Sequence, residues 1–188
     1  LEVELLLLQK NHYSSLIDSP WQGLLGRAIS AYASNEDNKE SSSVKCCLGG
    51  LLYSLITKLP TADGQHIEIN GWRKLSSFIG INDKGSSESL SERQYNTIKD
   101  WRNGKNRPSL QSFTGFSDNL FNSLNGQKGE ALELHYKIVI MLDNLEAKLL
   151  ANAPDQLATK EKIKEVLARY PIYYQECLSR ETKSVEPQ

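Results

Sequence analysis

Three histidines and three cysteines are the residues of this chain best suited to bind a metal ion or act as nucleophiles. His12, His66 and His135 are scattered, and none stands at the spacing from another histidine or a cysteine that zinc sites use. Cys46 and Cys47 are adjacent, which fits neither a C-x-x-C metal pair nor a disulfide framework. No nucleophile-elbow or phosphate-binding glycine motif occurs. The sequence therefore predicts no metal, no cofactor and no enzymatic activity.

Basic side chains gather between positions 91 and 107 and could bind an anionic partner. Five of them stand there against two acidic residues, Glu92 and Asp100, which gives a local net charge of +3. Such a cluster can neutralise several phosphate groups, and it is also compatible with an ordinary solvated helix face. Two further cations, Arg73 and Lys74, precede the cluster. Its five basic residues are Arg93, Lys99, Arg102, Lys105 and Arg107.

The whole chain has no general attraction for nucleic acid. It contains 188 residues, with 22 Lys and Arg against 23 Asp and Glu, and its formal net charge is -1. Binding to nucleic acid must therefore come from the local cluster. A hydrophobic content of 39% suffices for a sizeable core. The apolar run at 5–8 is too short to cross a bilayer and has no basic leader, so we expect a cytoplasmic protein with reduced thiols and no membrane contact.

Capping residues mark the ends of the helix that carries the basic cluster. Ser89 or Ser91 can begin it, because each is followed three residues later by a Glu or Gln that completes a capping box. Gly104 can end it in the left-handed conformation, and Pro108 prevents the helix from continuing. We therefore predict a helix over about 92–103.

An apolar helix is predicted before the cluster, over 44–59, and Pro60 ends it. Gly49 and Gly50 each weaken this helix by about 1 kcal/mol relative to Ala. We therefore expect another helix to pack closely against the paired glycines. The two adjacent cysteines on this helix are expected to be core and flanking residues rather than redox-active ones.

Shorter elements are predicted on either side of that helix. A helix over about 20–33 follows a Ser-Pro start signal, and Asn70 is expected to cap a short helix over 72–79 that Gly80 stops. The alternating stretch 66–69 predicts one extended segment, too short to define a sheet.

The longest helix is predicted over 129–150, where apolar residues recur every three or four positions. Such a stripe suits a core helix of the same domain, and it suits a homodimer contact as well. Asp155 or Thr159 begins a last helix, which Tyr170 and Pro171 interrupt. The stripe consists of Leu132, His135, Ile138 or Val139, Leu142, Leu145 and Leu149.

Two segments resemble the lambda-repressor-like, or XRE/Cro-type, helix-turn-helix family. Residues 75–82, LSSFIGIN, are similar to the end of that family's second helix, with Gly80 at the turn. Residues 98–110, IKDWRNGKNRPSL, are similar to the run that closes its recognition helix and opens the next one. Ile98 and Trp101 would bury one face of this helix and leave the opposite face to a DNA groove. The two segments cover about 20 of the 188 residues.

The resemblance implies a helix-turn-helix domain over 44–124, between N-terminal helices with a polar loop in 1–43 and C-terminal helices in 125–188, unless all three pack as one domain. In such a domain Gln and Asn suit adenine, Arg suits guanine, and neighbouring residues contact phosphates. Base contact is implied for Arg93, Gln94, Asn96, Thr97 and Lys99. Backbone contact is implied for Lys105 and Arg107, and the basic face also includes Arg73, Lys74 and Arg102.

Three features depart from the family pattern. Gly80 and Ile98 are 18 positions apart, far more than in the family, so the recognition helix begins earlier or a serine-rich loop enlarges the turn. Arg102 stands where the family has a glutamic acid, and Trp72 stands at a polar position that usually contacts phosphate. The family fold is still expected, with altered contacts to DNA.

We therefore expect an all-α protein that contains a lambda-repressor-like helix-turn-helix flanked by N- and C-terminal helices. We interpret it as a sequence-specific binder of double-stranded DNA, a transcriptional regulator, that dimerises through 129–150. The alternative is a helical protein–protein interaction module that keeps this shape without binding DNA. The segment 82–91 distinguishes the two functions. If it packs across the exposed face of the helix, that face cannot enter a major groove.

Overall fold

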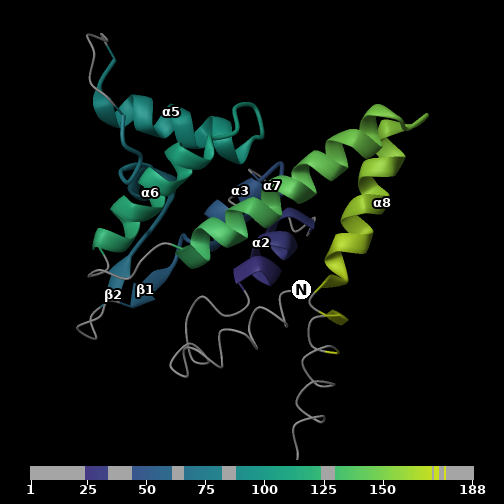
Figure 1. Cartoon of the computed structure of the whole chain (residues 1–188), viewed down its shortest axis with the longest axis horizontal. Helices are drawn as coiled ribbons and strands as arrows, with labels where there is room; N and C mark the ends of the chain where they lie inside the picture. The colour runs from purple at the N-terminus through teal and green to yellow at the C-terminus, as the bar shows by residue number, and fades with distance from the viewer. Residues whose placement is uncertain are drawn as a thin grey trace, which may run out of the picture.

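The computed structural model describes residues 24–33, 44–60, 66–81, 88–123, 130–170, 172–173 and 176. Within these residues the chain forms seven helices and one two-stranded antiparallel ribbon, which confirms the all-α class (Figure 1). The predicted start of a helix near position 20 lies outside the described residues.

Two apolar helices, α2 (Leu24–Ala33) and α3 (Cys47–Ser54), form the centre of the molecule. Gly50 allows them to approach closely, because a Cβ atom there would lie 2.0 Å from the carbonyl oxygen of Ala28. Cβ atoms in proteins do not lie within 3.0 Å of a backbone oxygen. The prediction that another helix packs closely against the paired glycines is therefore confirmed.

Helix α3 is shorter than the predicted 44–59. It ends at Ser54, and the chain turns at Leu55 into β1 (Lys58–Pro60), which pairs with β2 (His66–Glu68). The extended segment predicted over 66–69 is confirmed as β2, but it is one strand of a two-stranded ribbon. Leu55 is fully buried, so the apolar spacing that favoured a longer helix is real. Pairing with β2 satisfies the backbone groups that a continued helix would have paired internally.

Three helices follow the ribbon: α4 (Trp72–Ser76), α5 (Leu90–Arg102) and α6 (Leu110–Ser123). The expected capping of α4 by Asn70 was wrong. The residue before this helix is Gly71, which has φ 149° and makes no side-chain cap. That backbone conformation favours glycine, so the position of α4 depends on its entry turn rather than on a capping side chain.

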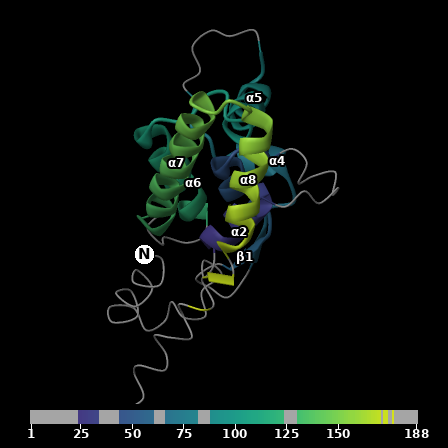
Figure 2. The ribbon, with the colours of Figure 1, turned by 90° about the vertical axis from the view of Figure 1, so that its right-hand side faces the viewer.

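A helical hairpin closes the fold, made of α7 (Glu130–Ala151) and α8 (Gln156–Ala168). Helix α7 contacts α3 and α6, whereas α8 contacts α2 (Figure 2). Asp155, one of the two predicted start residues, caps α8 by accepting a hydrogen bond from the N–H of Ala158 at 3.0 Å.

The predicted apolar stripe of α7 divides between the core and the solvent. Leu132 and Val139 are buried, whereas Leu145 and Leu149 are about half exposed. The prediction of a core helix is thus correct for the first half of the stripe. The buried face continues instead through Tyr136, Asp143 and Glu146.

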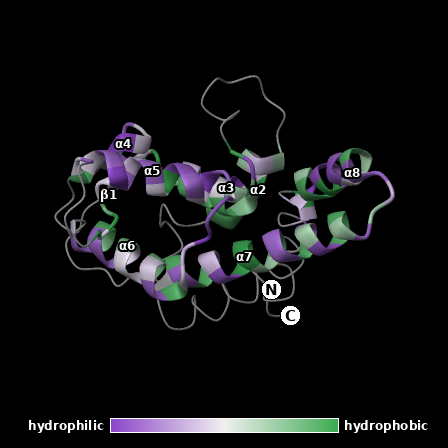
Figure 3. Ribbon diagram, turned by 90° about the horizontal axis from the view of Figure 1, so that it is seen from above, coloured by the Kyte–Doolittle hydropathy of each residue, from purple (hydrophilic) through white to green (hydrophobic). Residues whose placement is uncertain are grey.

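One hydrophobic core contains residues from α2 to α7, and Leu167 of α8 packs against it. The segments 1–43, 44–124 and 125–188 therefore share this core wherever they are described. Helices α4 and α5 carry mostly hydrophilic residues on one side of it (Figure 3). No helix within the described ranges is long and apolar enough to cross a membrane.

Candidate functional site

Helix α5 carries most of the predicted basic cluster and lies at one edge of the molecule (Figure 1). Its inner face holds Ile98, which is fully buried, and Trp101, which is 5% exposed, as the sequence predicted. Trp101 meets Phe116 of α6 edge to face, with 6.0 Å between ring centroids. A Cβ on Gly49 of α3 would lie 2.5 Å from the carbonyl oxygen of Arg102, so α3 supports the end of α5 closely.

Both ends of α5 have the predicted capping chemistry. The hydroxyl of Ser89 accepts a hydrogen bond from the N–H of Glu92 at 3.3 Å. Gly104 has φ 69°, and its N–H and that of Lys105 donate to carbonyl oxygens of the last turn at 3.1 and 3.0 Å. This is the Schellman arrangement, in which two backbone groups that a helix end leaves unpaired are satisfied.

The contact between α4 and α5 uses a residue that the family resemblance assigned to a DNA base. The side-chain amide of Gln94 donates to the carbonyl oxygens of Ile79 at 2.7 Å and of Ser77 at 3.4 Å. Gln94 therefore holds the chain that follows α4. Arg73 on α4 forms an exposed ion pair with Glu92 at 3.2 Å.

Guanidinium groups lie over aromatic rings along the same contact. The Arg73 guanidinium carbon is 4.5 Å from the centroid of the Tyr95 ring, and that of Arg102 is 4.8 Å from Trp72. Trp72 also lies 6.2 Å from Tyr53 of α3, with the rings inclined by 34°. Trp72 thus positions an arginine.

Other residues of the predicted site lie on the outer side of α5 and on the loop after it. Asn96, Lys99 and Lys105 are exposed, and the amide of Asn96 donates to a carboxylate oxygen of Glu88 at 2.9 Å. Lys74 is exposed on α4. These positions agree with the prediction that one face of α5 is open to solvent.

Two predicted base-contacting residues are only partly accessible. Arg93 and Thr97 are half-buried, and the Thr97 hydroxyl donates to the backbone carbonyl of Arg93 at 2.8 Å. Such a hydrogen bond within a helix is common for threonine and keeps its hydroxyl close to the backbone.

Arg107, expected to contact the DNA backbone, binds α7 in the structure. Its guanidinium donates to the side-chain oxygen of Asn144 and, at 3.3 Å, to the carbonyl oxygen of Asp143. The local charge of +3 therefore includes two arginines, Arg102 and Arg107, that hold the fold together. The exposed cations around α5 are Arg73, Lys74, Lys99, Lys105 and Arg107, of which Arg107 is held by α7.

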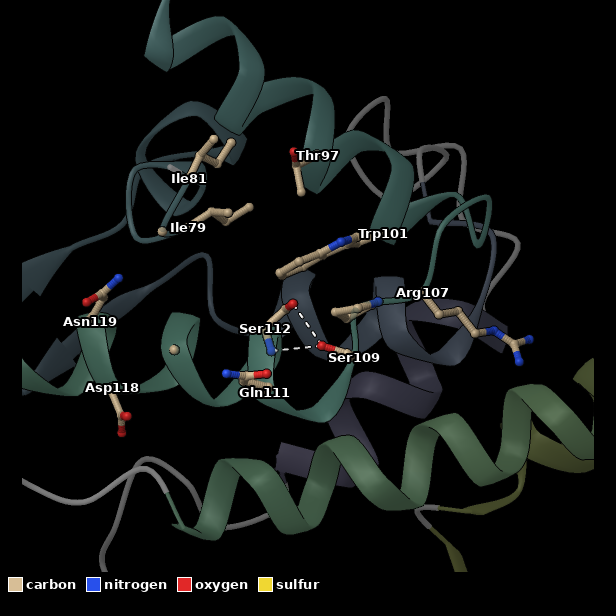
Figure 4. Close-up of a pocket in the computed structure, with 13 residues that line it drawn as sticks. Ile79, Ile81, Thr97, Trp101, Arg107, Ser109, Gln111, Ser112, Asp118 and Asn119 are labelled. Carbon is tan, nitrogen blue, oxygen red and sulfur yellow. Dashed lines mark hydrogen bonds between the residues drawn. The ribbon is translucent and has the colours of Figure 1, made fainter. Parts of the chain in front are cut away.

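A cleft of about 550 Å³ lies between α5, α6 and the loop after α4 (Figure 4). Ile79 and Trp101 form apolar walls, and Thr97 lines the cleft from α5. Its two ionisable lining residues, Arg107 and Asp118, point away from it. Neither ionisable lining residue is therefore directed into the cleft.

Buried polar residues on α7 were missed in the sequence. Asp143 accepts hydrogen bonds from the backbone N–H groups of Cys47 at 2.7 Å and Leu48 at 3.2 Å, while Glu146 accepts one from the hydroxyl of Tyr32. Burial raises the pKa of Asp143, and the two backbone hydrogen bonds oppose that shift. The alternating four- and three-residue spacing of the α7 core face was the signal that could have revealed this pair.

Both cysteines of α3 are buried, which agrees with their prediction as core residues. The Cys46 thiol accepts a hydrogen bond from the N–H of Gly49 at 3.3 Å and so caps the start of α3. Burial raises the pKa of Cys46 to about 12 and that of Cys47 also. Both thiols are therefore protonated at neutral pH and are poor nucleophiles.

In the described part of the chain, no group of three or more histidine, cysteine or acidic residues could hold a metal ion. Comparison of the sequence and the structure with known protein families, curated proteins and solved structures finds no match. Functional inference therefore depends on the geometry of α4, α5 and their surroundings.

Proposed function

We propose that this protein binds double-stranded DNA, with α4 and α5 acting as a helix-turn-helix and α5 entering the major groove. The outer face of α5 carries the proposal. The inner face is held by buried Ile98 and Trp101, both helix ends are capped, and Asn96 and Lys99 are exposed between them. A helix held in this way can present polar side chains to base edges without first becoming ordered.

The exposed side chains divide into two roles in this proposal. Asn96 and Lys99 would meet base edges, since an amide suits adenine and an ammonium group suits guanine. Arg73, Lys74 and Lys105 flank α5 and would contact phosphates, which position the protein without reading the sequence. Regulation of transcription is the role that such binding would serve.

The proposed binding is local and strongly dependent on salt. The chain has a net charge of -1, so only the cations around α5 would attract the DNA. Each phosphate contact adds about 0.9 to the slope of affinity against salt concentration on logarithmic axes.

A double variant, Lys99→Ala with Lys105→Ala, tests the proposal directly. We expect its affinity for duplex fragments to fall at least about tenfold at low salt. Its salt slope should decrease by about 1, because only Lys105 of this pair is proposed to contact a phosphate. Fluorescence anisotropy at several salt concentrations measures both. The matched control is Lys160→Ala with Lys162→Ala on α8, which removes the same charge far from α5. Unchanged binding in the first variant, or equal loss in the control, would overturn the proposal.

A helical protein-interaction module is the second candidate. It is favoured by the acidic residues Glu92 and Asp100 on the same helix, since charges of both signs can pair with complementary charges on a protein partner but the acidic ones repel DNA. The loop that was expected to separate the two functions lies largely outside the described residues, at 82–87. Absence of duplex binding by the folded wild-type protein at low salt would favour this candidate.

A further inference from the structure

Aromatic and cationic side chains alternate along the side of α5 that faces α4. Tyr95, Lys99 and Arg102 are spaced four and three residues apart, so they lie on one side of the helix. Trp72 and Arg73 of α4 lie against this side, where Arg73 covers Tyr95 at 4.5 Å and Arg102 covers Trp72 at 4.8 Å. The ring of Tyr53 on α3 extends the row, 6.2 Å from that of Trp72.

These side chains are only partly withdrawn from solvent. Tyr53, Trp72 and Tyr95 are half-buried, Lys99 is exposed, and the side chain of Arg73 is 64% exposed. Parts of these aromatic side chains and the positive charges of Arg73 and Lys99 are therefore accessible together. We call this the stacking surface, and it comprises Tyr53, Trp72, Arg73, Tyr95, Lys99 and Arg102.

Cation–π contacts concentrate in this part of the molecule. Among the described residues, three of the four cation–π contacts lie between positions 72 and 102, the third being Lys74 over Phe78. Significant contacts of this kind occur about once per 70–80 residues in proteins. The ion pair with Glu92 also helps to hold the Arg73 guanidinium over its ring.

We propose that the stacking surface binds unpaired nucleotides of a single-stranded nucleic acid. Bases would stack on the Arg73 guanidinium, which rests on Tyr95, and on the accessible part of Trp72, while Lys99 would contact a phosphate. Exposed π-faces and phosphates occur together in unpaired nucleotides, whereas the bases of a duplex cover one another. This activity goes beyond duplex binding and does not depend on it.

Binding of labelled dT12 and U12 oligonucleotides, compared with an abasic strand of the same length, tests the proposal. We expect the folded wild-type protein to bind the strands with bases at least about tenfold more tightly than the abasic strand. Similar binding of dT12 and U12 is expected, because stacking does not require a particular sugar. Equal affinity for dT12 and the abasic strand would overturn the proposal.

Substitutions then separate stacking from charge. Trp72→Leu and Tyr95→Leu should each weaken dT12 binding about tenfold, whereas Trp72→Phe and Tyr95→Phe should retain most of it. Circular dichroism and thermal unfolding check that each variant is folded. If the Leu variants unfold, the Phe variants and the abasic comparison still decide the question. Unchanged dT12 binding in folded Leu variants would contradict the proposal.

A crossed comparison distinguishes this inference from duplex binding. Asn96→Ala with Lys105→Ala should weaken duplex binding and leave dT12 binding within about twofold, while the Leu variants should do the reverse. Arg73 and Lys99 belong to both surfaces and remain unchanged in this comparison. If every variant lost both duplex binding and dT12 binding, the proposal that the two activities use separate surfaces would be contradicted. Free dTMP should compete less well than dT12 at the same nucleotide concentration. Equal competition by the two would contradict binding of a strand.

Discussion

Polar side chains serve opposite purposes in two regions of this molecule. Between α3 and α7 they are buried and act on the backbone, as Asp143 does at the start of α3. Between α4 and α5 they remain near the surface, where Arg73 and Arg102 lie over aromatic rings. The first arrangement stabilises the fold, and the second leaves charge accessible to a partner. Substitutions in the first region should therefore change the free energy of unfolding most.

The largest expected loss of stability follows Gly50→Ala, at the contact between α2 and α3. Its new Cβ would lie 2.0 Å from the carbonyl oxygen of Ala28, so the two helices must separate. We expect the free energy of unfolding in urea to fall by about 3 kcal/mol. The control is Gly115→Ala on α6, where a Cβ has no neighbour within 4 Å and should stabilise the helix by about 0.5–1 kcal/mol. Equal effects of the two substitutions would contradict this view of the core.

Asp143→Ala should cause the next largest loss, about 2 kcal/mol, because it leaves two buried N–H groups of α3 without their acceptor. Asp143→Asn keeps one acceptor oxygen and should lose less. Asp118→Ala removes an exposed carboxylate and should change stability by less than about 0.5 kcal/mol. Chemical denaturation of the three variants ranks them. A ranking with Asp118→Ala first would show that the buried carboxylate does not hold α3.

Alkaline pH should destabilise the interior region through its thiols. A folded-state pKa of about 12 for Cys46, above the ordinary 9.0, means that the folded protein retains a proton that the unfolded chain loses. This stabilisation is complete below about pH 9 and is lost as the pH rises toward 12, by up to about 1.4 kcal/mol per pH unit for each thiol. Unfolding curves between pH 8 and about 10.5 measure the slope. Cys47→Ala should reduce it, and an unchanged slope would contradict the assignment.

The smallest change in stability is expected at the surface, for Glu92→Gln. Its ion pair with Arg73 joins side chains that are 42% and 64% exposed, so its loss should cost less than about 0.5 kcal/mol. If α5 binds duplex DNA, removing this negative charge should raise that affinity severalfold. Glu165→Gln on α8 is the matched control and should leave binding unchanged. If Glu92→Gln greatly lowered the free energy of unfolding and did not raise the affinity for duplex DNA, the proposed contrast between a stabilising interior and a binding surface would be contradicted.

Part of the candidate site was predictable because it depends on local chemistry. The exposed positions of Asn96, Lys99 and Lys105 follow from the register of a helix whose apolar face carries Ile98 and Trp101. The long-range contacts of other site residues were not predictable. Gln94 reaches carbonyl groups 15 and 17 residues earlier, and Arg107 reaches α7 more than 30 residues later. The sequence shows that a helix position is polar, but it does not show whether the partner of that side chain is DNA, water or a distant carbonyl.

The sequence by itself determined where the clearest helix ends lie and that paired glycines mark a close contact. Ser89, Gly104 and Asp155 act on backbone groups within a few residues, so their effect does not depend on the rest of the fold. Only the tertiary structure decided that α3 stops at Ser54 and that Asp143 lies inside. Both outcomes depend on partners distant in the sequence, which supply the hydrogen bonds that make a turn or a buried carboxylate stable.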